Sequence, residues 1–239
     1  MSIIRIGIIL CLSFAYSKVI AQKPTVYLFP GQGSDYRIFD SIQFDSSYSV
    51  VHIQYAIPSK GISLREFSYS LISQIDSARP IILIGVSMGG MICCELESVL
   101  NPIKTIIISS AKCSNELPFR YTFQRYIPIY KLFPKRILYW GALLMQPLVE
   151  PDRKVCKATF KAMLKSKHPL YLKRTIAMIV TWDKYECNTK SIIHIHGNND
   201  HTLPVRNITA DYFIHNGSHM MTLTRGHEIE TILKQLLEH

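Results

Sequence analysis

Several features are scarce or missing in this chain of 239 residues, and each shortage excludes a class of protein. No stretch repeats at a fixed period or has low complexity, which excludes solenoid, fibrous and collagen-like folds. No Cys-x-x-Cys pair occurs, so a cysteine-rich zinc site is not supported. Only 18% of the residues are charged while 48% are apolar, which excludes a largely disordered chain and allows one large packed domain.

Long apolar runs are also missing. The run over residues 6–16 is too short to span a bilayer, which needs about 20 residues, and no later segment is a transmembrane candidate. This run follows a short opening that contains Arg5 and precedes the small residues Val19 and Ala21, a pattern typical of a secretory signal peptide. We therefore expect residues 1–21 to be cleaved, residues 22–239 to form a single domain, and the protein to be secreted or periplasmic.

Acidic residues are scarce in one segment. Residues 112–190 hold 16 Lys and Arg against 5 Asp and Glu, a net charge of +11, whereas residues 22–111 and 191–239 together hold 9 against 12, a net charge of −3. This basic segment also contains 12 of the 25 aromatic residues. Its charge fits an anionic substrate or a membrane surface, and no motif indicates specific nucleic-acid recognition. The simpler alternative is that its lysines cover solvated helix faces.

The cysteines are few and odd in number once the signal peptide is removed, so they cannot all pair within the chain. Cys93 and Cys94 are adjacent in an apolar helical stretch and are expected in the core. Cys113, Cys156 and Cys187 lie in or beside the basic segment, where an oxidising compartment would allow one disulfide. Spacing does not select the pair.

Strand-like and helix-like segments alternate along the remaining chain. Apolar runs predict strands over residues 25–29, 49–56, 80–85, 105–109, 191–196 and 209–215. Helical spacing of apolar residues predicts helices over residues 63–77, 88–100 and 228–237. The alternation predicts an α/β fold whose mainly parallel sheet has helices on both faces. The segment 112–190 interrupts it, and we expect a helical insertion over the carboxyl edge of the sheet.

The sequence Gly85-Val86-Ser87-Met88-Gly89 stands between a predicted strand and a predicted helix. Such a tight turn needs residues without a Cβ, and it lifts the serine into the open with the Met88 N–H facing its Oγ. The helix N-terminus favours negative charge that develops at this point. The motif therefore predicts a nucleophilic serine, and an ordinary strand–helix turn is the alternative interpretation.

A serine hydroxyl is a weak nucleophile unless a base takes its proton and an acid orients that base. Asp200 follows the predicted strand 191–196, and His219 follows the last predicted strand. The alternatives are an Asx turn at Asp200 and an ordinary surface histidine at His219, since the chain has 9 histidines. The stretch after strand 105–109 offers no carboxylate before Glu116, so Asp200 is the preferred acid.

This order of elbow serine, acid after a strand and histidine after the last strand resembles the α/β-hydrolase superfamily, from about Thr25 to the C-terminus. The chain is similar to small, mostly uncharacterised members. The resemblance implies the α/β-hydrolase fold with a helical cap insertion at about 112–190, and a catalytic triad of Ser87, His219 and Asp200. It also implies hydrolysis of a carboxylic ester or thioester through an acyl-enzyme, with no metal and no cofactor.

The resemblance also implies an oxyanion hole formed by two backbone N–H groups, those of Met88 and Gln32. Gln32 lies in Pro30-Gly31-Gln32-Gly33, where many members have a His-Gly pair that this chain lacks.

Two other resemblances are weaker. Residues 29–34 are similar to the opening motif of malonyl transferases, but in those enzymes the motif lies much further from the serine than the 55 residues between Gln32 and Ser87. The sequence from His194 to His201 resembles the zinc motif of metallo-β-lactamase-like enzymes. Two extra residues separate His196 from Asp200, which spoils the ligand geometry, so we expect His194 and His196 to be packed residues of one strand face.

The sequence thus predicts a serine hydrolase of the esterase, lipase or thioesterase kind. The expected partner is a small acyl substrate, either anionic or presented at a membrane, with peripheral membrane contact through the basic segment. Two alternatives stay open: a non-catalytic ligand-binding protein on the same fold, and a membrane-surface binding protein that acts through its basic insertion. A glycan on the sequon at Asn216 would crowd His219, which favours a prokaryotic envelope.

Overall fold

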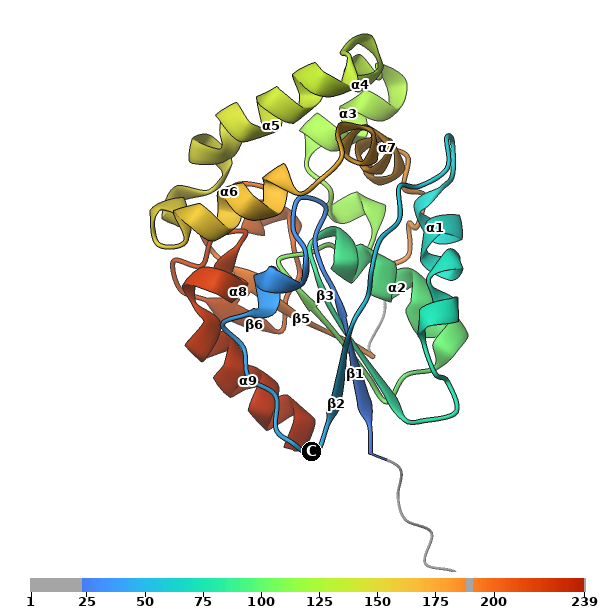
Figure 1. Ribbon diagram of the computed structural model, residues 1–239, viewed down its shortest axis with the longest axis vertical. Coiled ribbons are helices and arrows are strands. Elements are labelled where there is room, and N and C mark those ends of the chain that lie inside the picture. The colour runs from blue at the N-terminus through green and yellow to red at the C-terminus, as the bar shows by residue number, and fades with distance from the viewer. Residues whose placement is uncertain (1–22, 188–190, 239) are drawn as a thin grey trace, which may run out of the picture.

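The computed structural model describes residues 23–187 and 191–238, and the predicted signal peptide lies outside them (Figure 1). Six parallel strands form one sheet in the order β2-β1-β3-β4-β5-β6. The strands are β1 (Thr25–Phe29), β2 (Ser49–His52), β3 (Ile81–Val86), β4 (Lys104–Ile108), β5 (Ile192–Gly197) and β6 (Tyr212–Ile214). The strand order reverses direction at β1 and β3, and the carboxyl ends of such strands are where open parallel sheets bind ligands.

Helices cover both faces of the sheet, as Figure 1 shows. Leu83 of β3 belongs to a buried cluster with α1 (Leu64–Ser70) and α2 (Met88–Leu100). Its neighbour Ile84 belongs to a second cluster with α8 (Met221–Thr224) and α9 (Gly226–Glu238). Successive side chains of a strand point to opposite faces, so an uninterrupted apolar strand supplies both clusters. The predicted fold class is confirmed.

Several predicted boundaries move. The strand β1 and the helix α2 have the predicted limits, but the helix expected over residues 63–77 ends at Ser70 and continues as the 3₁₀ turn η2 (Ile72–Gln74). Hydroxyl groups near its end donate to helix carbonyls, Ser68 to Leu64 and Ser70 to Phe67, a competition that weakens helices. The strands β2 and β6 are shorter than predicted because each lies at an edge and pairs with one neighbour only.

The basic segment forms a helical cap over the carboxyl ends of the strands (Figure 1). Between β4 and β5 the described residues contain only helices and turns: η3 (Ser114–Glu116), α3 (Phe119–Tyr126), α4 (Ile129–Leu132), α5 (Lys135–Val149), η4 (Pro151–Lys154), α6 (Lys157–Lys165) and α7 (Pro169–Val180). We call residues 112–187 the cap.

A disulfide joins the two ends of the cap. It links Cys113 to Cys187 across 74 residues, with the Cα atoms 5.0 Å apart. Cys156 is a free thiol. Cys93 and Cys94 are fully buried, as expected for core residues. Of the helices in the described residues, none is long and apolar enough to cross a membrane.

Candidate active site

The turn between β3 and α2 holds Ser87 in a strained conformation. Its φ of 54° and ψ of −121° lie outside the regions that non-glycine residues usually adopt. The turn is possible because the crowded positions on either side of Ser87 are glycines, which have no Cβ. A Cβ on Gly89 would lie 2.0 Å from the Phe29 carbonyl oxygen, and one on Gly85 would lie 2.4 Å from the Gly89 carbonyl. The Ser110 hydroxyl donates to the Ser87 carbonyl oxygen at 2.7 Å and helps to fix the turn.

The structure brings the three predicted triad residues together. His219 Nε2 lies 2.9 Å from Ser87 Oγ, and His219 Nδ1 lies 2.7 Å from Asp200 Oδ2. The second carboxylate oxygen, Asp200 Oδ1, accepts from the backbone N–H groups of Thr202 at 2.7 Å and Leu203 at 2.8 Å. Residues that are 132 positions apart in the chain are therefore in hydrogen-bond contact at the carboxyl end of the sheet.

The electrostatics of these groups are consistent with a single tautomer of His219. Burial raises the pKa of Asp200, but the adjacent His219 and His196 outweigh it and leave the pKa below its usual value, so the carboxylate is ionised. An ionised carboxylate only accepts hydrogen bonds, so His219 Nδ1 carries the proton and Nε2 is free to accept one from the Ser87 hydroxyl. Burial lowers the pKa of His219, but the carboxylates of Asp200 and Glu150 leave it raised.

The two predicted oxyanion residues flank the serine. Met88 is the first residue of α2, so its backbone N–H has no acceptor inside the helix. Gln32 follows β1 and lines the same cavity as Ser87. Its side-chain amide donates to Thr175 Oγ1 at 2.8 Å and to the Leu172 carbonyl at 3.3 Å, and both acceptors belong to α7. The loop after β1 is thus fixed to the cap.

A cavity of about 170 Å³ opens at Ser87 and His219. The sheet loops supply its floor and the cap supplies much of its wall. The apolar cap residues that line it are Leu117, Tyr121, Phe160, Leu164 and Ile179. Ligand cavities commonly measure about 300–1,000 Å³, so this one favours a small and largely apolar group.

Glu150 of the cap also lines the cavity, and sequence reasoning missed it. It is buried, and burial, partly opposed by the Ser218 hydroxyl and His219, raises its pKa to about 6. The available signal was its position as the first acid after 33 residues without one, between Leu117 and Val149. That signal does not reveal that Glu150 folds back onto the cavity.

His194 and His196 are packed residues, as expected. Both side chains are fully buried in β5, their rings are in edge contact at 5.1 Å, and burial lowers the pKa of each. His196 Nε2 lies 2.9 Å from the Leu203 carbonyl oxygen, so it supports the loop that carries Asp200. Within residues 23–187 and 191–238, no group of three or more His, Cys, Asp or Glu side chains is arranged to hold a metal.

Comparison with solved structures agrees with this architecture. A hydrolase from Oleispira antarctica superposes with a TM-score of 0.69 at 12% identity, covering 91% of this chain and 92% of its own. The enol-lactonase from Burkholderia xenovorans LB400 gives 0.67 at 13% identity, with coverage of 91% and 92%. The chain has the α/β-hydrolase fold.

A third α/β-hydrolase-fold structure, a thermophilic esterase from Thermogutta terrifontis, gives a TM-score of 0.65 at 12% identity and covers 91% of this chain and 90% of its own. No protein-family model matches the sequence, and no curated protein matches it. Identities this low establish the fold, and the chemistry must be argued from the site itself.

Proposed function

We propose that this protein is a serine hydrolase that cleaves a carboxylic ester or thioester. The observation that carries the proposal is the continuous chain of contacts from Asp200 through His219 to Ser87 at the mouth of a cavity. The names of the structural neighbours, which include an esterase and an enol-lactonase, are consistent with it. A ligand-binding protein without activity would have no need of the strained serine.

In the proposed reaction His219 Nε2 takes the Ser87 proton as Oγ bonds to the substrate carbonyl carbon. The backbone N–H groups of Met88 and Gln32 stabilise the resulting oxyanion. The carbonyl then re-forms, the carbon–oxygen or carbon–sulfur bond of the substrate breaks, and His219 gives its proton to the leaving group. A water molecule then attacks the acyl-enzyme, with His219 again taking a proton and then giving it to Ser87 Oγ, which releases the carboxylic acid and restores the serine. Asp200 keeps His219 in the required tautomer throughout.

A panel of esters and thioesters of varied acyl length tests this proposal. Ser87→Ala should lower turnover by about 10⁴-fold or more, because the nucleophile is lost. Its thermal unfolding should match that of the native protein, because the hydroxyl lies at the cavity rather than in the core. Near-native turnover by Ser87→Ala would disprove the mechanism.

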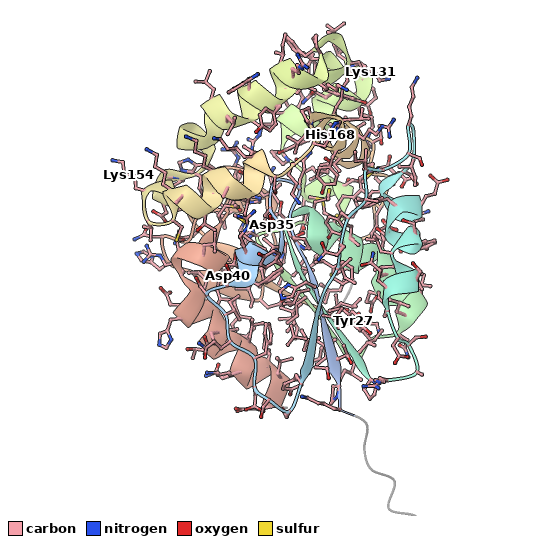
Figure 2. All side chains as sticks on the ribbon, viewed as in Figure 1. Tyr27, Asp35, Asp40, Lys131, Lys154 and His168 are labelled. Atoms are coloured by element: carbon pink, nitrogen blue, oxygen red, sulfur yellow. A yellow bond between two sulfur atoms is a disulfide. The ribbon has the colours of Figure 1, made fainter. Side chains whose placement is uncertain are left out.

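We also propose that the outer face of the cap binds anionic membranes. Large apolar side chains on α3, α4 and α5 are 66–81% exposed, namely Phe119, Tyr126, Leu132, Trp140 and Leu144. Large exposed apolar side chains in such number are typical of interaction surfaces. The exposed basic residues Lys131, Lys135 and Arg136 lie among them, with no acid between Leu117 and Val149. Figure 2 shows Lys131 at one end of the cap and Lys154 at the other.

The positive charge of this face favours binding to an anionic bilayer over dimerisation with a second copy of the chain. Two copies meeting at it would bring like charges together, whereas anionic headgroups attract each Lys or Arg by about 1 kcal/mol and the aromatic side chains suit the interface. Membrane binding by the cap would bring the protein to acyl groups presented at the bilayer.

Sedimentation with phosphatidylcholine vesicles, with and without phosphatidylglycerol, tests the membrane contact. Binding should require the anionic lipid and weaken with added salt. The double variant Trp140→Ala/Leu144→Ala should bind at least about tenfold more weakly, and Ile103→Ala, which alters an exposed apolar residue outside the cap, should bind normally. Equal binding by both variants, or a native dimer that the double variant abolishes, would overturn the proposal.

Finally, we propose that the protein works outside the cytoplasm, in a prokaryotic envelope or secreted from it. The N-terminal pattern and the Cys113–Cys187 disulfide both support this location, since disulfides persist mainly in oxidising compartments. Mass spectrometry of the mature protein should find its N-terminus at or near Gln22. Intact Met1 in a cytosolic fraction would contradict the proposal.

A further inference from the structure

The loop that carries His219 lies between β6 and α8 and has no regular secondary structure. Its first residues are held by the loop after β5. The Asn216 N–H donates to Asn198 Oδ1 at 2.7 Å, and the Gly217 carbonyl accepts from the Asn199 N–H at 3.0 Å. These contacts end two residues before His219, so the position of the histidine also depends on contacts made further along the loop.

Glu150 of the cap contacts both neighbours of His219 in the chain. Its Oε2 accepts from the Met220 backbone N–H at 3.1 Å. The Ser218 hydroxyl also hydrogen-bonds to the Glu150 carboxylate. Glu150 is 3% exposed and Ser218 is 0% exposed, so water competes little with these contacts. One carboxylate, between α5 and η4, thus holds the chain on either side of the proposed catalytic base.

A second buried carboxylate of the cap, Glu116, has different partners. Its Oε2 accepts from the Lys112 N–H at 2.6 Å and its Oε1 from the Thr209 N–H at 3.2 Å. Both partners lie outside the His219 loop, and Glu116 does not line the cavity at Ser87. Glu116 is therefore a matched control, a buried cap carboxylate with two backbone contacts that do not involve the active site.

The charge of Glu150 acts on His219 as well. Burial raises the pKa of Glu150 to about 6, and Ser218 and His219 oppose the rise, so the carboxylate is largely ionised at neutral pH. Burial lowers the pKa of His219, but Asp200 and Glu150 outweigh it. Both carboxylates therefore favour the imidazolium that forms when His219 takes the Ser87 proton.

Building on the proposed hydrolase function, we infer that Glu150 is a positioning residue for His219. Its contacts with Ser218 and Met220 hold the loop so that the imidazole stays within hydrogen-bond reach of the Ser87 hydroxyl. Proton transfer depends steeply on this geometry, and a displacement of about 1 Å can lower the rate by about 10²-fold. The cap thus helps to assemble the catalytic groups in addition to lining the cavity.

Hydrolysis of a small neutral ester such as propyl butyrate tests the inference. Each variant is measured on the plateau of its own pH profile, where His219 is neutral, so that a changed pKa does not affect the comparison. Glu150→Ala should lower kcat by about 30- to 100-fold and change KM by less than about threefold, because the base is displaced while the apolar wall of the cavity remains.

Glu150→Gln distinguishes the contacts from the charge. The amide oxygen can accept from the Met220 N–H, and the NH₂ group can donate to Ser218 Oγ. This variant should therefore keep kcat within about fivefold of the native value. Glu116→Ala also loses two buried contacts, so it should melt at a lower temperature, but it should keep the native kcat and KM.

Ser218→Ala removes one of the two contacts and only a hydroxyl group, so it gives an answer even if Glu150→Ala does not fold. It should lower kcat by about threefold or more. Combined with Glu150→Ala it should have no further effect, because the partner of the hydroxyl is already absent. Losses that simply multiply in the double variant would show that the two residues act independently and would overturn the inference.

The other outcomes separate the inference from the proposed function. A native kcat in Glu150→Ala or Ser218→Ala, equal losses in Glu150→Ala and Glu116→Ala, or a loss in Glu150→Gln as large as in Glu150→Ala would overturn the role of Glu150 and leave the serine mechanism standing. The absence of both ester turnover and fluorophosphonate labelling of Ser87 in the native protein would overturn the two together.

Discussion

The sheet and helix α5 of the cap differ in how far their apolar residues are exposed. Every residue of β3 is buried, and its side chains are shared between the two core clusters. In α5, residues 137–145 are all apolar or glycine, yet Trp140 and Leu144 are exposed. A helix that is apolar all round is normally buried, which is why we propose that this part of the cap contacts a membrane. The sheet thus positions Ser87, Asp200 and His219, and cap residues line much of the cavity beside them.

Besides the apolar side chains that the cap contributes to both core clusters, specific polar and covalent contacts join the cap to the sheet region. The disulfide closes the cap at its base, and Gln32 connects the loop after β1 to α7. Glu95 of α2 accepts from Trp182 Nε1 at 2.7 Å and from Arg65 Nε at 3.0 Å, which ties the end of the cap to the helix that follows Ser87. Because these contacts can be altered one at a time, the effect of a substitution on the cap can be compared with its effect on the sheet.

The largest effect is expected from a change on the sheet side. Asp200→Asn should lower kcat by about 10⁴-fold, because an amide in this position favours the wrong tautomer of His219. The Asn side chain can still accept from Thr202 and Leu203, so the melting temperature should change little. Kinetics and thermal unfolding of the same preparation check both statements, and a loss of less than tenfold would remove Asp200 from the mechanism.

The next effect belongs to the cap. Loss of the disulfide in Cys113→Ser should lower the free energy of unfolding by up to about 4 kcal/mol in the chain-entropy account of a loop of this length. Hydrogen exchange should accelerate first in α3 to α7 and remain slow in β3. Cys156→Ser, which alters a free thiol, is the control. Uniform loosening of sheet and cap would show that the two regions do not behave separately.

Much of the sheet side could be predicted from the sequence. The limits of β1 and α2 and the proximity of Ser87, Asp200 and His219 follow from local patterns, because a parallel sheet brings the ends of its strands to one edge. The helical character of the cap and its place over the carboxyl ends of the strands were predicted too, but its individual contacts were not, because they depend on how helices fold back over the sheet. Neither the pairing of Cys113 with Cys187 nor the contact of Glu150 with Met220 has a local signal.

The smallest expected effect couples the two regions through pH. His219 must be neutral to accept the Ser87 proton, so kcat/KM falls as the pH drops through its pKa. Burial and Arg120 lower this pKa, but the Asp200 and Glu150 carboxylates outweigh them and leave it raised. His196 also lies close enough to interact with His219. Glu150→Gln removes one negative charge, so the pKa of His219 should fall and the acidic limb of the kcat/KM profile for a small neutral ester should move to lower pH. An unmoved or opposite shift would show that Glu150 does not act on His219.

Covalent labelling shows whether Asp200, His219 and Ser87 act together as a catalytic triad. The native protein is treated with a fluorophosphonate, digested, and analysed by peptide mass spectrometry to locate the adduct. We expect a single adduct on Ser87, which is lost in His219→Ala and in the protein unfolded before treatment, because only the assembled triad activates the hydroxyl. No adduct on the native protein, or equal labelling of Ser87 in His219→Ala, would contradict this mechanism.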